Sequence, residues 1–216
     1  MNIVVKDNWE FFSHNRRSLY HVTTTDRLDS IKKFGLNPVI SQVLRRGDAN
    51  IGGVYLSKSV LTSVEVFKRE EPNNLNKLIL FEVPRKNINM NNLYIDLEYI
   101  FDTAVLTHTF RDLIDFAKRY PCKYDATKQN YRNYINYLVD NMILVKNVFN
   151  SKGERSEIKL DKRSANAFIR CLKEAECFYY TNTIPFNQIK FLGKVKELDR
   201  HCYDIPDIYT RKDYVQ

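Results

Sequence analysis

The chain has 216 residues, of which 44% are hydrophobic and 13% aromatic, and it carries a formal net charge of +8. This composition is typical of a globular protein and excludes a disordered one, and the length predicts a single domain over residues 1–216. No apolar run approaches the length of a membrane span, and the N-terminus lacks the charged and then apolar pattern of a signal peptide. We therefore expect a cytoplasmic protein with no membrane partner.

The spacing of the cysteines and histidines shows no metal-binding pattern. The four cysteines contain no C-x-x-C pair, which fits reduced thiols, and the four histidines lie far apart. We therefore expect no metal site. The positive net charge favours a polyanionic partner, although a basic surface also serves solubility and the abundance of Asn, Lys, Ile and Tyr also fits a coding bias.

In chain order, the first predicted element is a strand over residues 19–23, which are mainly aromatic and β-branched. A helix is predicted over residues 27–34, with Thr24-Thr25-Asp26 at its start. Gly35 is expected to cap its C-terminus. Apolar residues recur in this helix at intervals of three, which predicts one buried stripe of Leu28, Ile31 and Phe34.

The next predicted strand lies within residues 52–59 and has two glycines at its entrance. Those glycines lack the context of a dinucleotide fold or a P-loop, so a tight turn is their simplest interpretation. A serine-capped helix over residues 60–70 follows, with Val60, Val64 and Phe67 on one face. Residues 78–84 form the clearest strand pattern in the chain, ended by a proline, and residues 93–96 predict a short strand.

The second half of the chain begins with helical patterns and continues with a charged stretch. Apolar spacing predicts helices over residues 110–117 and 131–145. Residues 146–170 are polar and contain more basic than acidic side chains, which is typical of a solvated face. Because this stretch directly precedes Glu174, we expect its basic residues near the substrate that this region handles.

Residues 173–195 form the stretch around which we expect the chain to be organised. Glu174 and Glu176 precede an aromatic strand over residues 177–180, and a second strand is predicted over residues 189–195 after a turn. If the first strand begins at Glu174, both carboxylates project to one side, because residues two apart share a face. They would then lie at the mouth of a strand hairpin, open to a ligand. The alternative is that both are solvated loop acids.

Three short motifs occur in a recognisable order. They are Tyr-His-x-Thr at 20–23, with Gly-Leu after the following helix, Gly-Val-Tyr-Leu-Ser at 53–57, and Glu-Cys-Phe-Tyr-Tyr at 176–180. Together they resemble the ADP-ribosyltransferase superfamily, and more narrowly its His-Tyr-Glu branch, which includes the poly(ADP-ribose) polymerase catalytic domains. The first and last motifs also resemble the DarT toxins, which ADP-ribosylate DNA bases. The resemblance covers most of the chain in order and depends on these three motifs.

The resemblance implies an α+β fold in which two small, mostly antiparallel sheets flank an NAD⁺ cleft, with peripheral helices. It implies that NAD⁺ is a substrate and that Glu176 stabilises the oxocarbenium-like transition state at the nicotinamide-side ribose. Glu174 would orient or deprotonate the acceptor. His21 would donate a hydrogen bond to the adenosine ribose, and Tyr55 would stack on nicotinamide. The full set assigned to NAD⁺ is Tyr20, His21, Thr23, Gly53 and Tyr55. Without the resemblance, His21 is a core histidine and Tyr55 a packed strand residue.

The motifs do not identify the molecule that accepts the ADP-ribose. The net charge and the DarT-like motifs favour DNA or RNA, and the residues expected to contact its phosphates are Lys159, Lys162 and Arg163. The Glu174-x-Glu176 pair resembles that of arginine-modifying transferases and favours a protein acceptor, although those enzymes usually have Arg and Ser in place of His21 and Tyr55. A third hypothesis is a non-catalytic module that binds nucleic acid or NAD⁺. The DarT resemblance further implies a toxin or phage-conflict effector with an antitoxin as partner.

Overall fold

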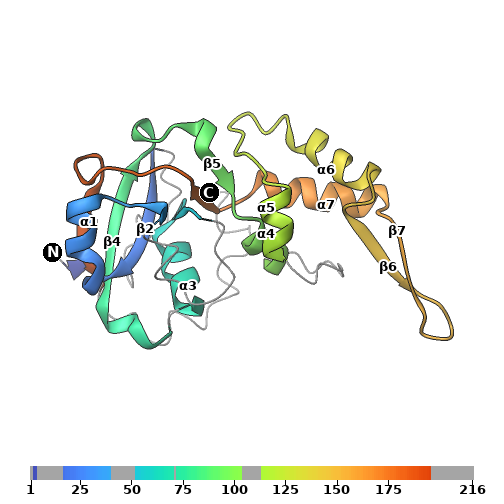
Figure 1. The fold of residues 1–216 in the computed structure, drawn as a ribbon, viewed down its shortest axis with the longest axis horizontal. Coiled ribbons are helices and arrows are strands. Elements are labelled where there is room, and N and C mark those ends of the chain that lie inside the picture. The colour runs from blue at the N-terminus through green and yellow to red at the C-terminus, as the bar shows by residue number, and fades with distance from the viewer. Residues whose placement is uncertain (1, 4–16, 40–51, 71, 104–112, 196–216) are drawn as a thin grey trace, which may run out of the picture. The chain divides into compact units, whose positions relative to one another are not determined.

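The computed structural model describes residues 2–3, 17–39, 52–70, 72–103 and 113–195 (Figure 1). The chain divides into two compact units, and each is built from discontinuous segments. The first unit contains residues 1–36, 56–87 and 184–216, and the second contains residues 37–55 and 88–183. Both units combine helices with mainly antiparallel strands, so the predicted α+β class is confirmed.

The first unit is a sheet covered by helices. Its strands follow the order β1-β9-β4-β2-β3, with β1 parallel to β9 and the other pairs antiparallel. The predicted bounds of α3 and β4 agree with the structure. The elements are β1 (Asn2–Ile3), β2 (Ser18–Thr24), α1 (Leu28–Phe34), the second half of β3 (Val54–Ser57), α3 (Val60–Glu70), β4 (Leu78–Pro84) and β9 (Lys190–Val195).

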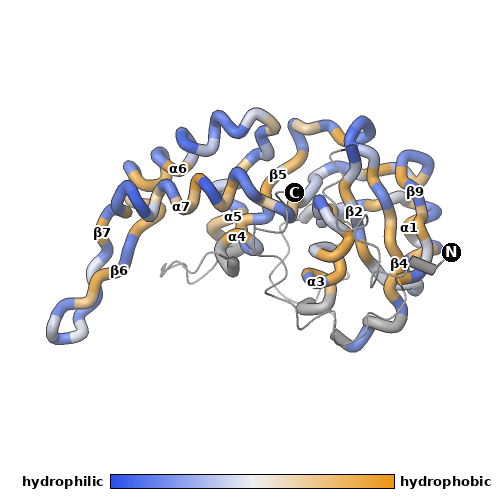
Figure 2. The backbone as a smooth tube through the Cα atoms, turned by 180° about the vertical axis from the view of Figure 1, so that it is seen from behind, coloured by the Kyte–Doolittle hydropathy of each residue, from blue (hydrophilic) through white to orange (hydrophobic). Residues whose placement is uncertain are grey.

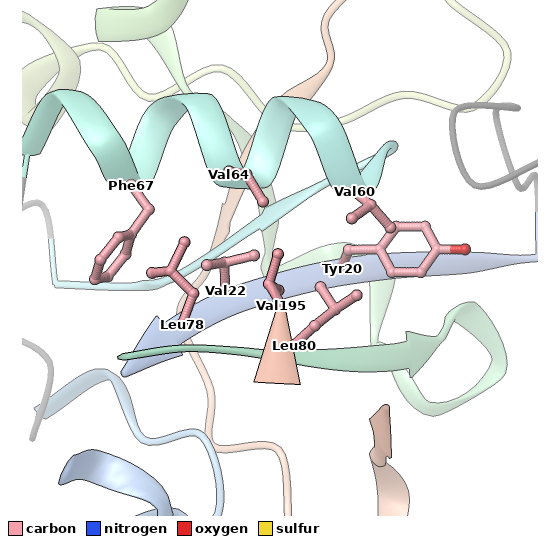
Figure 3. Packing of buried hydrophobic residues seen from close by; sticks show 8 residues of the cluster. All are labelled: Tyr20, Val22, Val60, Val64, Phe67, Leu78, Leu80 and Val195. Atoms are coloured by element: carbon pink, nitrogen blue, oxygen red, sulfur yellow. The ribbon is translucent and has the colours of Figure 1, made fainter. Parts of the chain in front are cut away.

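Helix α3 packs on this sheet through the predicted stripe (Figure 3). Both faces of β4 are buried, which explains its almost unbroken apolar run, visible as hydrophobic colouring in Figure 2. Burial of each large apolar side chain stabilises the fold by roughly 1.5–3 kcal/mol. The buried cluster consists of Tyr20, Val22, Val60, Val64, Phe67, Leu78, Leu80 and Val195.

Helix α1 buries less of its predicted stripe than expected. Ile31 is buried, but Phe34 is 47% exposed, so the prediction for Phe34 is wrong. Phe34 is the last helical residue, and the ammonium group of Lys33 lies 4.9 Å from its ring centroid. Gly35 ends the helix, as predicted, and donates its N–H to the carbonyl of Ile31 at 2.8 Å.

The second unit contains a short antiparallel sheet, several helices and a separate hairpin. Its strands β3, β8 and β5 are neighbours in that order, and β6 pairs only with β7 among the described residues. The elements are the first half of β3, β5 (Leu93–Ile95), α4 (Leu97–Thr103), α5 (Leu113–Arg119), α6 (Tyr131–Asp140), β6 (Val145–Phe149), β7 (Arg155–Lys159), α7 (Lys162–Lys173) and β8 (Cys177–Tyr180).

The predicted helix over residues 131–145 is too long. Helix α6 ends at Asp140, and Met142 adopts a positive φ of 57°, which a continuing helix does not allow. The chain then enters β6 instead. Apolar residues at helical spacing continue past Asp140, but here they belong to a turn and a strand. No helix in the described ranges has both the length and the apolar character that a membrane span requires.

Helices α6 and α7 alternate between hydrophilic and hydrophobic residues along their length (Figure 2), and they pack against each other. Helix α7 begins at an N-cap, because Oδ1 of Asp161 accepts a hydrogen bond from the N–H of Ser164 at 2.8 Å. This hydrogen bond is the main cause that lowers the pKa of Asp161. The buried face of α7 consists of Phe168, Ile169 and Leu172.

Candidate functional site

Strand β2 carries the first predicted motif in the first unit. Tyr20 lies in the buried cluster under α3, so packing alone explains an aromatic residue there (Figure 3). His21 lies on the opposite face of the strand, paired in register with Phe81, and is partly exposed. Thr23 is buried, and its hydroxyl accepts a hydrogen bond from Nη1 of Arg27 at 3.5 Å. Of these three residues, His21 is the one with a partly exposed side chain.

The second motif consists of Gly53 and strand β3, which follows it, and Gly53 has a clear packing role in the second unit. A Cβ atom at this position would lie 2.9 Å from Cβ of Tyr179 on the neighbouring strand β8. Real Cβ atoms essentially never come this close to another heavy atom. The glycine therefore lets the Tyr179 ring lie against β3, and this explains its presence without a ligand.

Tyr55 belongs to a row of tyrosines that crosses three neighbouring strands of the second unit. Its ring centroid lies 6.4 Å from that of Tyr179, which stacks on Tyr94 of β5 at 5.2 Å. Burial raises the pKa of Tyr179, so its phenol stays protonated. Tyr179 is buried, whereas Tyr55 and Tyr94 are partly exposed at the two ends of the row. The row thus offers aromatic surface at both ends.

The two glutamates do not share a strand face, so that prediction is wrong. Helix α7 continues to Lys173, Glu174 is its C-cap residue, and β8 begins only at Cys177. An acid at a helix C-terminus is unfavourable for the helix dipole. Here Nε of Arg170 lies 3.4 Å from Oε1 of Glu174 and offsets part of that cost. Glu174 is exposed, whereas Glu176 is partly buried directly before the strand.

The predicted hairpin between residues 177–180 and 189–195 is also absent from the described residues. Strand β8 pairs with β5 and neighbours β3, whereas β9 pairs with β4 and β1. Residues 184–189 instead contain a bridge to Leu36 and a short 3-10 helix. The carboxylate of Glu176 therefore lies between a helix end and a strand rather than at a hairpin mouth.

The basic residues predicted to contact phosphates differ in their surroundings. Nζ of Lys159 lies 2.5 Å from Oδ1 of Asp140, so much of its charge is already compensated. Lys162 and Arg163 form the exposed first turn of α7, and neither makes an ion pair with any described residue. These two cations are therefore available to an anionic ligand.

The first unit contains a buried hydroxyl network that the sequence patterns did not predict. Oγ of Ser57 donates to the carbonyl of Ser59 at 2.6 Å and also contacts Oγ of Ser63. Ser63 in turn donates to the carbonyl of Tyr20 at 3.2 Å, which ties the end of β3 to β2. The available signal was the density of Ser and Thr at residues 57–63, although it does not distinguish a helix cap from a network.

Two predictions concern groups that a ligand or metal would use. Cys122, Cys171 and Cys177 are free, as expected, and burial raises the pKa of the Cys122 thiol to about 12, which makes it unreactive. No group of three or more potential metal ligands gathers among the described residues.

Comparison of the chain with protein-family models, curated proteins and solved structures found no match.

Proposed function

We propose that the protein is an NAD⁺-dependent mono-ADP-ribosyltransferase that modifies a macromolecular acceptor, with nucleic acid as the favoured class. The observation that carries this proposal is the order of strands. Within the first unit, the strand with His21 pairs with the end of β3, at Ser57. Within the second unit, the start of β3, with Gly53 before it and Tyr55 in it, is the neighbour of the strand that Glu176 precedes. In each unit, segments of the transferase-like motifs that lie far apart in the sequence are thus on neighbouring strands.

The reaction would break the bond between nicotinamide and C1′ of its ribose. Nicotinamide leaves with the bonding electron pair, the ribose gains oxocarbenium character, and a nucleophilic atom of the acceptor attacks C1′ and loses its proton. Glu176 supplies the counter-charge and binds a hydroxyl of that ribose. Loss of such a contact typically raises the barrier by about 3 kcal/mol, which corresponds to a rate reduced by about 100-fold or more.

Other side chains would hold the dinucleotide. His21 is the partly exposed residue of its motif and donates a hydrogen bond to the adenosine ribose. Tyr55, at one end of the tyrosine row, offers its ring to nicotinamide. Tyr20 and Gly53 act indirectly, because both are explained by packing. Thr23 supports the site through its hydrogen bond with Arg27. The finer fold expected for this chemistry, two sheets flanking an NAD⁺ cleft, is part of the same proposal.

A nucleic-acid acceptor is supported by the net charge of +8 and by the exposed cations at the start of α7. The protein-acceptor alternative depends on Glu174 and Glu176 acting as a pair. That alternative loses support because Glu174 caps α7 and forms an ion pair with Arg170. A toxin that is restrained by an antitoxin remains the biological setting that we propose.

The decisive experiment incubates the protein with labelled NAD⁺ and, separately, with DNA, RNA or a protein extract. We expect label to remain on nucleic acid and to be released by nuclease but not by protease. Glu176→Gln should reduce both transfer and NAD⁺ hydrolysis by about 100-fold or more. Glu174→Gln separates the two activities: if Glu174 orients the acceptor, this variant should reduce transfer more than hydrolysis. Absence of NAD⁺ consumption, together with no thermal shift in millimolar NAD⁺, would refute the proposal.

A further inference from the structure

The β6–β7 hairpin of the second unit has apolar side chains that are exposed to solvent. It extends away from α6 and α7 (Figure 1), and its base is anchored by buried residues on either side. Farther out, Val148 is 37% exposed, Phe149 is 64% exposed and Ile158 is 45% exposed. The buried residues at the base are Leu144, Val145 and Leu160. An isolated two-stranded hairpin is at best marginally stable in water, so other contacts must keep this one ordered.

The turn of the hairpin supplies such contacts. Oδ1 of Asn150 accepts hydrogen bonds from the N–H groups of Lys152 and Glu154, each at 2.9 Å. Its Nδ2 donates to Oε2 of Glu154 at 2.6 Å. Gly153 takes a φ of 77°, which glycine adopts at little cost. The turn is therefore preorganised even though it is exposed.

One side-chain contact joins the two strands next to the turn, and a second one lies within β7. Nε of Arg155 donates to Oδ1 of Asn147 at 2.8 Å, and its Nη2 lies 2.8 Å from Oε1 of Glu157. Phe149 lies on the same face, directly opposite Arg155 in register. The acids of the hairpin are thus engaged within the hairpin, while the Phe149 ring stays exposed.

The charges around the hairpin indicate which class of ligand its exposed face binds. Residues 140–173 contain eight basic and four acidic side chains. Among the described residues, four cations in this stretch have no ion-pair partner: Lys152 in the turn, Lys162 and Arg163 at the start of α7, and Lys173 at its end. The hairpin thus carries an exposed aromatic ring, and cations without an ion-pair partner lie in its turn and on the helix that follows it. This is a combination that binds nucleic acid, because bases stack on the ring and phosphates bind the cations.

We propose that the β6–β7 hairpin binds the nucleic-acid substrate by stacking a base on Phe149 and holding phosphates with Lys152, Lys162 and Arg163. This inference rests on the proposed nucleic-acid acceptor. The hairpin is long enough to contact several nucleotides. The four residue steps from Phe149 to the base of the hairpin span about 13 Å. That distance corresponds to roughly four nucleotides at the spacing of one strand in a duplex. The hairpin is then the element that positions the acceptor.

The test measures affinity for a fluorescein-labelled single-stranded oligonucleotide by anisotropy, without NAD⁺. Phe149→Ala should weaken binding by about 5- to 150-fold, and Phe149→Trp should restore it. Tyr137→Ala is the matched control, because Tyr137 is 56% exposed on α6 of the same unit and should leave affinity unchanged. Circular dichroism should show that all three variants are folded. Equal affinities of Phe149→Ala and the wild type would overturn the proposal, as would no binding by the wild type.

Two further measurements separate stacking from charge. Heparin is a polyanion without bases, so its binding should not respond to Phe149→Ala, and an equal loss for heparin and oligonucleotide would overturn the stacking role. Replacing Lys152, Lys162 and Arg163 by Gln should reduce the slope of log affinity against log salt by about 2. An unchanged slope would overturn the phosphate contacts. Sedimentation that shows a dimer dissociated by Phe149→Ala would mean that the hairpin binds a second copy instead.

The outcomes also separate this inference from the proposed function. If NAD⁺ hydrolysis depends on Glu176 but the affinity for the oligonucleotide is unchanged in Phe149→Ala, the hairpin proposal alone fails. If oligonucleotide binding depends on Phe149 while NAD⁺ is neither bound nor consumed, the transferase proposal alone fails.

Discussion

Gly35 is the position where we expect an added methyl group to lower the free energy of unfolding most among three glycines, Gly35, Gly53 and Gly153. Its φ of 72° and ψ of −169° lie in a region that is essentially restricted to glycine. A Cβ atom there would lie 2.3 Å from the carbonyl oxygen of Ile184 and 3.0 Å from Cα of Pro185. Both are backbone atoms, and that same Ile184 oxygen already accepts the N–H of Leu36 at 2.9 Å. The clash therefore cannot be relieved by a side-chain rotation.

The cost of Gly35→Ala can be worked from these two effects. The backbone conformation costs about 1–3 kcal/mol for alanine, and forcing atoms into a packed site typically costs about 1–3 kcal/mol more. We therefore expect the free energy of unfolding to fall by about 2–6 kcal/mol, measured by urea denaturation. For a chain of this size that loss lowers the melting temperature by about 4–24 °C.

Gly153→Ala is the matched control for this prediction. Gly153 also has a positive φ, 77°, but a Cβ atom there would meet nothing within 4 Å. Only the backbone cost of about 1–2 kcal/mol applies. The lower entropy of the unfolded alanine chain affects both variants equally. Equal losses of stability in the two variants would refute the reasoning, because the contact with Ile184 would then contribute nothing.

Two smaller predictions test local hydrogen bonds. Ser59→Ala should lower the free energy of unfolding by about 1 kcal/mol in urea denaturation, because Oγ of Ser59 accepts the N–H of Thr62 at 3.0 Å and caps α3. A loss below the experimental error would contradict this capping role. Hydrogen bonds from the Thr127 hydroxyl and then from the Asn130 N–H lower the pKa of Asp125 from 3.8 to about 2. Carboxyl ¹³C NMR should therefore show a titration midpoint near 2, and the stability that Asp125 contributes should be complete above pH 3.8 and lost as the pH falls toward 2. A midpoint near 3.8 would show that these hydrogen bonds do not form.

Sequence patterns predicted the buried parts of the fold best. The bounds of α3 and β4 were correct because apolar residues must face the core, and their spacing records which face is buried. Phe34 was misplaced because spacing does not show where a helix stops facing the core. The hairpin β6–β7 was missed for a related reason, since its strands are largely exposed and carry no alternation of apolar and polar residues.

The candidate site was harder to predict than the core, since it depends on pairing between distant segments. The residues around Glu174 have no local signal that separates the end of a helix from the start of a strand. The candidate motifs were identified by their resemblance to a family, and the packing roles of Tyr20 and Gly53 became visible only in the structure. Both positions look like ligand contacts in sequence because packing and binding favour the same residue types.

Because Glu174 caps α7 and does not belong to a strand, the backbone on either side of Glu176 is held by two different elements. Ala175 and Cys177, the residues on either side of Glu176, are both buried. The N–H of Ala175 donates to the carbonyl of Leu172 at 3.3 Å, and the carbonyl of Cys177 accepts the N–H of Asp96 at 3.0 Å. The backbone of Glu176 is therefore fixed from a helix on one side and from a strand on the other, while its side chain stays partly exposed. In the reaction that we propose, a counter-charge is most effective when it needs no reorganisation as the charge on the ribose develops. A carboxylate on a backbone fixed at both ends meets that condition better than one at the mouth of a hairpin.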